Sequence, residues 1–233
     1  MTDWTKVPPL RPVSDLGFYL GSIEARMPAQ HGYRDNRVGT WAHETTHGLN
    51  SRLRQGHSNS NALFVCPDNC CVVPEPRGLT LTSLASAVPA SWRGMSYSLY
   101  LQQQARYWND QPTYVLDEWT AYANGTLATN EMKTEAPYTD PLQMVEFMGY
   151  SLVLASKAVD NTQLTGFVGY FCRYTIRTLN HVAETYDLSR ASSHLNGPIR
   201  SSQDGEGIRS WAREFYGATW AQEVLRENPM GVA

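Results

Sequence analysis

The pattern of apolar and polar positions predicts a chain built mainly from helices. Apolar residues recur at helical spacing over two long segments, 141–159 and 163–186, and again in one or two shorter segments between 206 and 226. Residues 37–55 show the same periodicity. That segment ends before Gly56, which we expect to cap the helix because glycine readily adopts the left-handed backbone of such caps.

Two further helices are predicted in the middle of the chain. One spans about 95–108, where residues at helical spacing would share one face, namely Leu99, Gln103 and Tyr107. The other spans about 113–124 and should stop at Gly125, because glycine is unfavourable inside a helix.

A few short segments have the character of strands. Two apolar runs, 62–65 and 71–73, flank the turn signal Pro67-Asp68-Asn69 and predict a small hairpin. Residues 16–20 are predicted to form a short strand, whereas 79–88 fits either a strand or a short helix. The whole pattern predicts an α+β fold in which helices dominate.

Length and composition predict one globular domain spanning residues 1–233. The chain has 233 residues, of which 42% are hydrophobic and 18% are charged, and these proportions suit a protein with a buried core. We expect residues 1–94 to contribute a small sheet and the 37–55 helix, and residues 95–233 to form a helical lobe.

Charge and hydropathy argue against two classes of partner. The formal net charge is −3, which gives no sign of the basic surface that nucleic-acid binding requires. The most apolar region, 142–158, is interrupted by polar side chains, so no membrane span of about 20 mostly apolar residues is predicted. The first six residues lack the basic and apolar regions of a signal peptide. A removed signal could still have preceded Met1, so the sequence assigns no compartment.

Three of the four cysteines crowd into one short segment. Cys66, Cys70 and Cys71 lie there, and Cys172 is far along the chain. The even count permits two disulfides, but free buried thiols fit the sequence equally well. A second zinc site is disfavoured, because the cluster lacks paired C-x2-C spacing and no histidine lies close by. We therefore expect the cluster to serve the hairpin, away from any zinc.

His43-Glu44-Thr45-Thr46-His47 is the segment with the clearest chemistry, and it falls on the predicted 37–55 helix. Residues four apart lie on one face of a helix, so the imidazoles of His43 and His47 can reach one metal ion. Glu44 would stand beside that ion, where its carboxylate can take a proton from a water that the metal has acidified. The pattern predicts a mononuclear zinc site with one Zn2+ per chain.

This H-E-x-x-H arrangement resembles the active site of the zincin metallopeptidases. The resemblance implies a zincin-like fold with a small sheet beside the motif helix. It also implies hydrolysis of a peptide or protein substrate, with Glu44 as general base and then general acid.

The third protein ligand would decide the subfamily. Metzincins continue the motif with a glycine and a third histidine, but this chain has Asn50 and Leu53 at those positions. His57 lies just past the predicted helix and could fold back. Gluzincins instead take a glutamate from a downstream helix, and the best match is Glu118, which lies among apolar residues in the predicted 113–124 helix. A buried carboxylate needs a strong partner, either zinc or the arginine of an ion pair.

The segment around Glu118 leaves a rival ligand. Asp117 is the alternative, but Glu118 is preferred because its longer side chain reaches further and Ala121 on the same face leaves room. Tyr122 stands where thermolysin-like gluzincins have an acidic residue that supports a histidine. The resemblance to that group is therefore incomplete.

The residue that would stabilise an oxyanion is not fixed by the sequence. Side chains able to do so are Tyr114, Tyr122, Tyr170, Tyr174, His181 and His194. Two other functions also fit: a zinc-binding interaction domain without turnover, and a metal-free helical domain in which the motif is accidental. Glu44 argues against the first because a structural zinc site needs no base, and metal analysis of the purified protein would separate the second.

Overall fold

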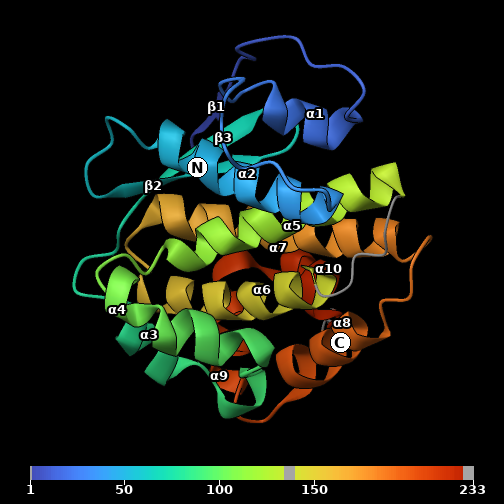
Figure 1. Ribbon diagram of the computed structural model, residues 1–233. Helices are drawn as coiled ribbons and strands as arrows, with labels where there is room; N and C mark the ends of the chain where they lie inside the picture. The colour runs from blue at the N-terminus through green and yellow to red at the C-terminus, as the bar shows by residue number, and fades with distance from the viewer. Residues whose placement is uncertain (1, 134–139, 228–233) are drawn as a thin grey trace.

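Helices make up most of the molecule, and they are layered around one long buried helix, α5 (Tyr114–Met132). In the computed structural model, α2 (Val38–Leu53) packs on one side of α5 and α6 (Asp140–Lys157) on another, with α7 (Thr162–Val182) against α6 (Figure 1). This arrangement confirms the predicted helix-dominated α+β class.

Shorter helices complete the fold within residues 2–133 and 140–227, which are the residues that the structure describes. These shorter α-helices are α1 (Phe18–Glu24), α3 (Leu81–Ala87), α4 (Ala105–Trp108), α8 (Ser189–His194), α9 (Glu206–Tyr216) and α10 (Ala218–Leu225). A 3-10 turn and two π-helical segments are η1 (Ala90–Trp92), η2 (Tyr97–Gln103) and η3 (Leu195–Ile199). No helix in the described ranges is both long and apolar enough to cross a membrane.

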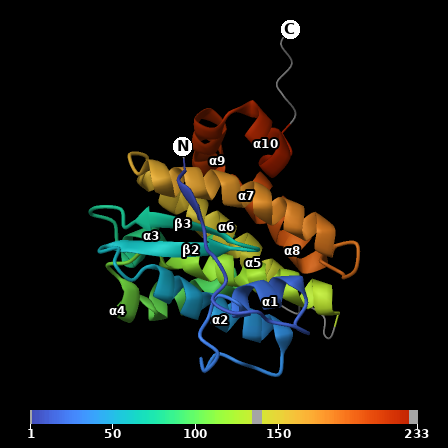
Figure 2. The same ribbon diagram turned by 90° about the horizontal axis from the view of Figure 1, so that it is seen from above.

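A small antiparallel sheet lies beside α2. In the described part of the chain its three strands run in the order β1 (Trp4–Lys6), β3 (Asn69–Pro74) and β2 (Ser60–Val65). Strands β2 and β3 form the predicted hairpin, and β1 pairs along the other side of β3. Seen from above, α1 and α2 lie on the opposite side of the molecule from α9 and α10, and strands β2 and β3 lie between α7 and α2 (Figure 2).

The buried apolar side chains form two clusters. The larger one collects α5, α6, α7 and the C-terminal helices, and includes Trp119 and Phe147. The smaller one lies between α1, α2 and one face of the sheet, and includes Leu49 and Phe64 together with Ala128 of α5. Helix α2 therefore belongs to the small cluster, whereas α5 contributes to both.

Helix α5 continues past Gly125, where the sequence predicted that it would stop. A Cβ atom at this position would lie 3.0 Å from the carbonyl oxygen of Gly39 and 3.6 Å from the Cβ of His43. Gly125 is therefore a close contact between α5 and α2. The prediction was wrong because helix propensity depends only on local sequence. This glycine is required by the close packing of α5 against α2, a segment distant in sequence.

The predicted strand at 16–20 is also wrong. Helix α1 begins at Phe18, after Gly17 with a φ of 67°. The free backbone N–H groups of Phe18 and Tyr19 donate to the carboxylate of Glu131 on α5, at 2.8 and 2.9 Å. A side chain more than a hundred residues away in sequence thus accepts hydrogen bonds from the free N–H groups at the start of α1.

The predicted helix at 95–108 is interrupted. It divides into the π-helix η2 and the short α4, and Leu99 and Tyr107 on its expected buried face are 44% and 64% exposed. The ambiguous segment 79–88 contains a helix, α3, whose first turn is capped by Thr80.

A buried carboxylate fixes the start of α2. Glu24 is fully buried and accepts a hydrogen bond from the indole Nε1 of Trp41 at 2.7 Å. The same carboxylate pairs with Arg11 at 2.8 Å and with His31 at 2.7 Å. Because Trp41 lies just before the histidine motif, these contacts hold the first turn of that helix against α1.

Candidate metal centre

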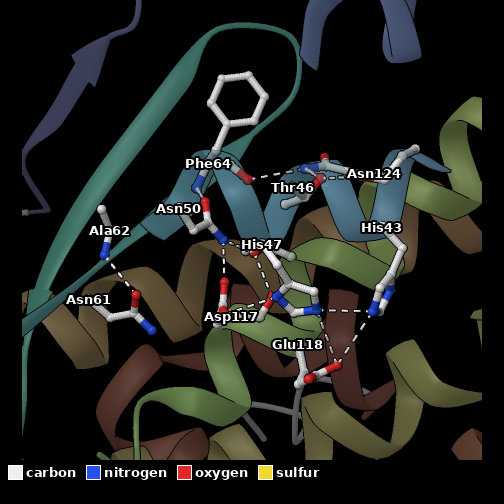
Figure 3. A network of polar contacts seen from close by, with 12 residues as sticks. His43, Thr46, His47, Asn50, Asn61, Ala62, Phe64, Asp117, Glu118 and Asn124 are labelled. Atoms are coloured by element: carbon white, nitrogen blue, oxygen red, sulfur yellow. Dashed lines mark hydrogen bonds and ion pairs between the residues drawn. The ribbon is translucent and has the colours of Figure 1, made fainter. Parts of the chain in front are cut away.

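Three side chains from two helices converge on one point. His43 and His47 project from α2 toward Glu118 on α5 (Figure 3). The Nε2 atoms of the two histidines lie 3.0 Å apart, and each lies 3.6 Å from Oε2 of Glu118. Among the described residues these three form a group that could hold a metal ion. The structure thus brings together the three ligands that the sequence analysis selected.

The donor atoms fit a metal ion. Two ligands held about 2.0–2.2 Å from one zinc at tetrahedral angles lie roughly 3.3–3.5 Å apart, close to the separations observed here. The Oε2 atom of Glu118 is buried and accepts no hydrogen bond within the described part of the chain. A buried carboxylate oxygen without a donor is costly, and a cation would satisfy it.

Asp117 is placed differently from Glu118. Its Oδ2 lies 3.0 Å from Nδ1 of His47, on the far side of the imidazole from Glu118 (Figure 3). When Nδ1 carries the proton and donates it to Asp117, the lone pair of Nε2 faces the other two donors. The aspartate that the sequence left as a rival ligand instead orients one of the histidines.

Asn50 extends this contact to the sheet. Its Nδ2 donates to Oδ1 of Asp117 at 2.5 Å and to Oγ1 of Thr120 at 3.2 Å, while its Oδ1 accepts from the backbone N–H of Phe64 at 2.7 Å (Figure 3). Asn50 occupies the position where the metzincin motif has glycine. In this fold it links α2, α5 and β2 around His47.

A second asparagine joins the same three elements. The Nδ2 of Asn124 donates to Oγ1 of Thr46 at 3.3 Å and to the carbonyl of Phe64 at 3.2 Å. Its Oδ1 accepts from the backbone N–H of Cys66 at 3.3 Å. Both asparagines are almost fully buried, so these contacts stiffen the position of α2 relative to α5.

The pKa values of the two histidines are shifted in opposite directions. Burial lowers the pKa of His43 well below its usual value, and the neighbouring His47 acts in the same direction. Burial also lowers the pKa of His47, but the carboxylates of Asp117 and Glu118 outweigh it and raise that pKa well above the usual value. Without a metal, the proton between the two Nε2 atoms therefore resides on His47.

Two tyrosines lie near the three donors, and Glu44 lies on the same helix as the histidines. Glu44 is exposed on α2, next to His43. The ring of Tyr122 lies 4.4 Å from the ring of His43, centroid to centroid. Burial, followed by the charge of Glu118, raises the pKa of Tyr114. Two of the tyrosines noted in the sequence are therefore near the site.

Other candidates from the sequence lie elsewhere. His57 lies beyond the end of α2 in a surface hollow with Arg54 and Asp110. The further candidate side chains are on α7 and α8, namely Tyr170, Tyr174, His181 and His194.

The four cysteines are free and buried. Burial raises the pKa of Cys70 to about 11, so its thiol is protonated at neutral pH. The group of possible metal ligands found among the described residues contains no cysteine.

Sequence analysis missed one tyrosine beside the site. Tyr100 lies on η2, and its hydroxyl is 2.5 Å from the hydroxyl of Tyr122. It fell within the segment that was predicted as a regular helix, so its direction could not be inferred from helical spacing. The π-helical winding of η2, which is wider than that of an α-helix, gives its side chains directions that α-helical spacing does not predict.

Comparisons of the chain with models of protein families, with curated proteins and with solved structures found no match. The site is therefore interpreted from its own residues.

Proposed function

We propose that this protein is a zinc-dependent hydrolase and, more narrowly, a zincin-like peptidase. The observation that carries the proposal is the convergence of Nε2 of His43, Nε2 of His47 and Oε2 of Glu118, with the exposed carboxylate of Glu44 on the same helix. A peptide or protein substrate follows from the resemblance of the motif to the zincin metallopeptidases.

His43, His47 and Glu118 would hold the ion. Two imidazoles and one carboxylate are a ligand set that suits zinc and matches catalytic sites with three protein ligands. Zinc bound there would supply Lewis-acid chemistry, polarising the scissile carbonyl and lowering the pKa of water.

The remaining steps belong to the chain's own side chains. Asp117 accepts the Nδ1 proton of His47 and so keeps its Nε2 lone pair available. The Glu44 carboxylate takes a proton from the water that attacks the carbonyl carbon. It then delivers that proton to the departing amine nitrogen as the C–N bond breaks, so that one water is consumed for each bond cleaved.

A catalytic role is favoured over a structural one by exposure. The side chains of His43 and His47 are 12% and 21% exposed, so solvent reaches the site. A structural zinc site is closed by a fourth protein ligand and has no use for an adjacent base.

The first test is metal content. The purified protein should bind about one zinc per chain, and the double variant His43→Ala/His47→Ala should lose it, as measured by elemental analysis after dialysis. His57→Ala is the matched control and should keep the metal. Full zinc retention by the double variant would rule out this site.

The second test separates binding from catalysis. Glu44→Gln should keep zinc and the fold, because Glu44 is not among the ligands, but should lose hydrolysis of fluorescein-labelled casein by on the order of a hundredfold or more. If that variant cleaves casein as fast as the parent, the base lies elsewhere. If the parent binds zinc and cleaves nothing, the non-catalytic zinc protein is the better description.

A further inference from the structure

A chain of polar side chains runs from α6 through α5 to η2, beside the candidate metal centre. The Nε2 of Gln143 donates to the hydroxyl of Tyr122 at 2.8 Å, and that hydroxyl lies 2.5 Å from the hydroxyl of Tyr100. Tyr122 is almost fully buried, whereas Tyr100 is only half-buried. The chain therefore begins inside the molecule and ends at a phenol that solvent can reach.

The direction of the protons follows from the donor at the buried end. An amide nitrogen can only donate, so the oxygen of Tyr122 accepts the hydrogen bond from Gln143. Tyr122 then has its own proton to direct at the oxygen of Tyr100. With Tyr122 as the donor of that bond, the O–H of Tyr100 is left for a third partner.

The two phenols lie beside the metal centre. The ring of Tyr122, whose hydroxyl contacts that of Tyr100, lies 4.4 Å from the ring of His43, centroid to centroid. Burial, followed by the charges of Glu118 and Glu44, raises the pKa of Tyr100. The ring of Tyr100 packs against Phe147, with centroids 5.1 Å apart, which fixes the position of the hydroxyl. An oriented O–H beside such a site is suited to a substrate oxygen that gains negative charge.

We propose that Tyr100 is a further catalytic residue, whose O–H donates a hydrogen bond to the carbonyl oxygen of the bound substrate, with Tyr122 and Gln143 as positioning residues. This inference rests on the proposed hydrolase function. Tyr100 keeps its proton throughout, and the hydrogen bond strengthens as the attack of water places negative charge on the carbonyl oxygen.

The neighbouring tyrosines are less suited to this role. The hydroxyl of Tyr122 already contacts Gln143 and Tyr100. Tyr114 is stacked against Trp108 at 5.3 Å with an interplanar angle of 7°, and its hydroxyl is hydrogen-bonded to Glu118. Tyr100 is half-buried like Tyr114, but its hydroxyl contacts the hydroxyl of Tyr122 and no carboxylate in the described part of the chain.

The experiment compares three single hydroxyl deletions. Tyr100→Phe keeps the ring packed on Phe147, Tyr122→Phe interrupts the chain of hydrogen bonds, and Tyr107→Phe is the control on the adjoining α4 because its side chain is 64% exposed. All three should retain the parent's zinc affinity, measured by competition with a chromophoric chelator, since none is a ligand.

Catalysis on labelled casein should respond in a graded way. Tyr100→Phe should lower kcat on the order of a hundredfold and leave KM within about twofold, because the bond forms mainly in the transition state. Tyr122→Phe should lower kcat about tenfold, since the Tyr100 hydroxyl remains but is no longer oriented. Tyr107→Phe should match the parent. Unchanged kcat in Tyr100→Phe would overturn the inference.

A binding measurement decides the same question without turnover. Phenylphosphonate presents tetrahedral oxygens that resemble a hydrated carbonyl, and its affinity for zinc-loaded protein can be measured by calorimetry in the Glu44→Gln background. Adding Tyr100→Phe should weaken binding at least about tenfold. Equal affinity with and without the Tyr100 hydroxyl, including no binding by either protein, would overturn the inference. If casein is not cleaved by the parent, the proposed function fails, while this comparison still decides the role of Tyr100.

Discussion

Asp117 and Glu118 are neighbours in the sequence, yet they face different atoms of the same histidine. Successive residues of an α-helix point about 100° apart. The shorter aspartate therefore meets Nδ1 of His47 at 3.0 Å, while the longer glutamate reaches the Nε2 side at 3.6 Å. The difference between a ligand and the residue that orients a ligand is set here by one step along α5.

This geometry predicts two different zinc defects. Glu118→Ala should lower zinc affinity by several kcal/mol at most, because it removes a donor. Asp117→Asn should lower it only about 10- to 100-fold, because the amide still contacts His47 but no longer favours the Nδ1 tautomer. Chelator competition on both variants and the parent gives the comparison. The ligand assignment fails if Glu118→Ala binds zinc like the parent while Asp117→Asn does not.

At the scale of elements, the close contact of α2 and α5 sets the site. Gly125 faces the carbonyl of Gly39 and the Cβ of His43, so the two helices are in close contact beside the first histidine. The asparagines Asn50 and Asn124 tie both helices to β2. The distance between the histidines and Glu118 therefore depends on helix contacts outside the three donor atoms themselves.

A pair of glycine substitutions tests this contact. Gly125→Ala should destabilise the protein by about 1–3 kcal/mol despite the better helix propensity of alanine, because the new methyl meets backbone at 3.0 Å. Gly207→Ala on α9 is the matched control. It has nothing within 4 Å of its added Cβ and should be neutral or stabilise by up to ~1 kcal/mol. Urea unfolding measures both, and a stabilised Gly125→Ala would show that the helices can separate without cost.

Local features of the sequence predicted most of the elements. The predictions failed where contacts with residues distant in sequence determine the local structure. The hairpin, α2, α6 and α7 were predictable because their periodicity and turn residues act over a few positions. The strand proposed at 16–20 failed because the N–H groups of α1 are satisfied by Glu131, which is remote in sequence. The ligand set was predictable from the motif and one buried glutamate. Tyr100 was missed because a π-helix changes the direction of side chains that helical spacing assigns.

At the scale of the whole molecule, the candidate metal ligands lie on helices that belong to the two buried clusters. Leu49 of α2 belongs to the small cluster and Trp119 of α5 to the large one. An ion held by both helices would oppose their separation and so stabilise the native state. At a free zinc concentration a hundred times the dissociation constant, the gain is about 2.7 kcal/mol.

The pH dependence of stability should reverse with metal. In zinc-free protein the raised pKa of His47 gives a stabilisation that is complete below its ordinary pKa and is lost as pH rises through the raised value. The stability advantage of the parent over His47→Gln in chelator should therefore shrink on going from pH 6 to 8. The stabilisation of the parent by added zinc should grow over the same range, because zinc displaces the proton. Urea unfolding at several pH values checks both trends. If the advantage of the parent in chelator and its stabilisation by zinc change in the same direction with pH, the raised pKa does not belong to His47.

The shortest strand of the sheet has a consequence for the behaviour of the protein in solution. β1 has three residues, pairs with β3 along one side, and carries Trp4, whose ring packs 4.8 Å from that of Tyr170. Without it, β3 would become an open edge whose unpaired backbone groups could recruit another chain. Deleting residues 1–6 should therefore promote concentration-dependent self-association in light scattering, with Lys6→Ala as the control that keeps the strand. Strand β1 would then protect the edge of β3 from pairing with other chains. A cleavable fusion placed before it should be designed so that residues 4–6 still pair with β3.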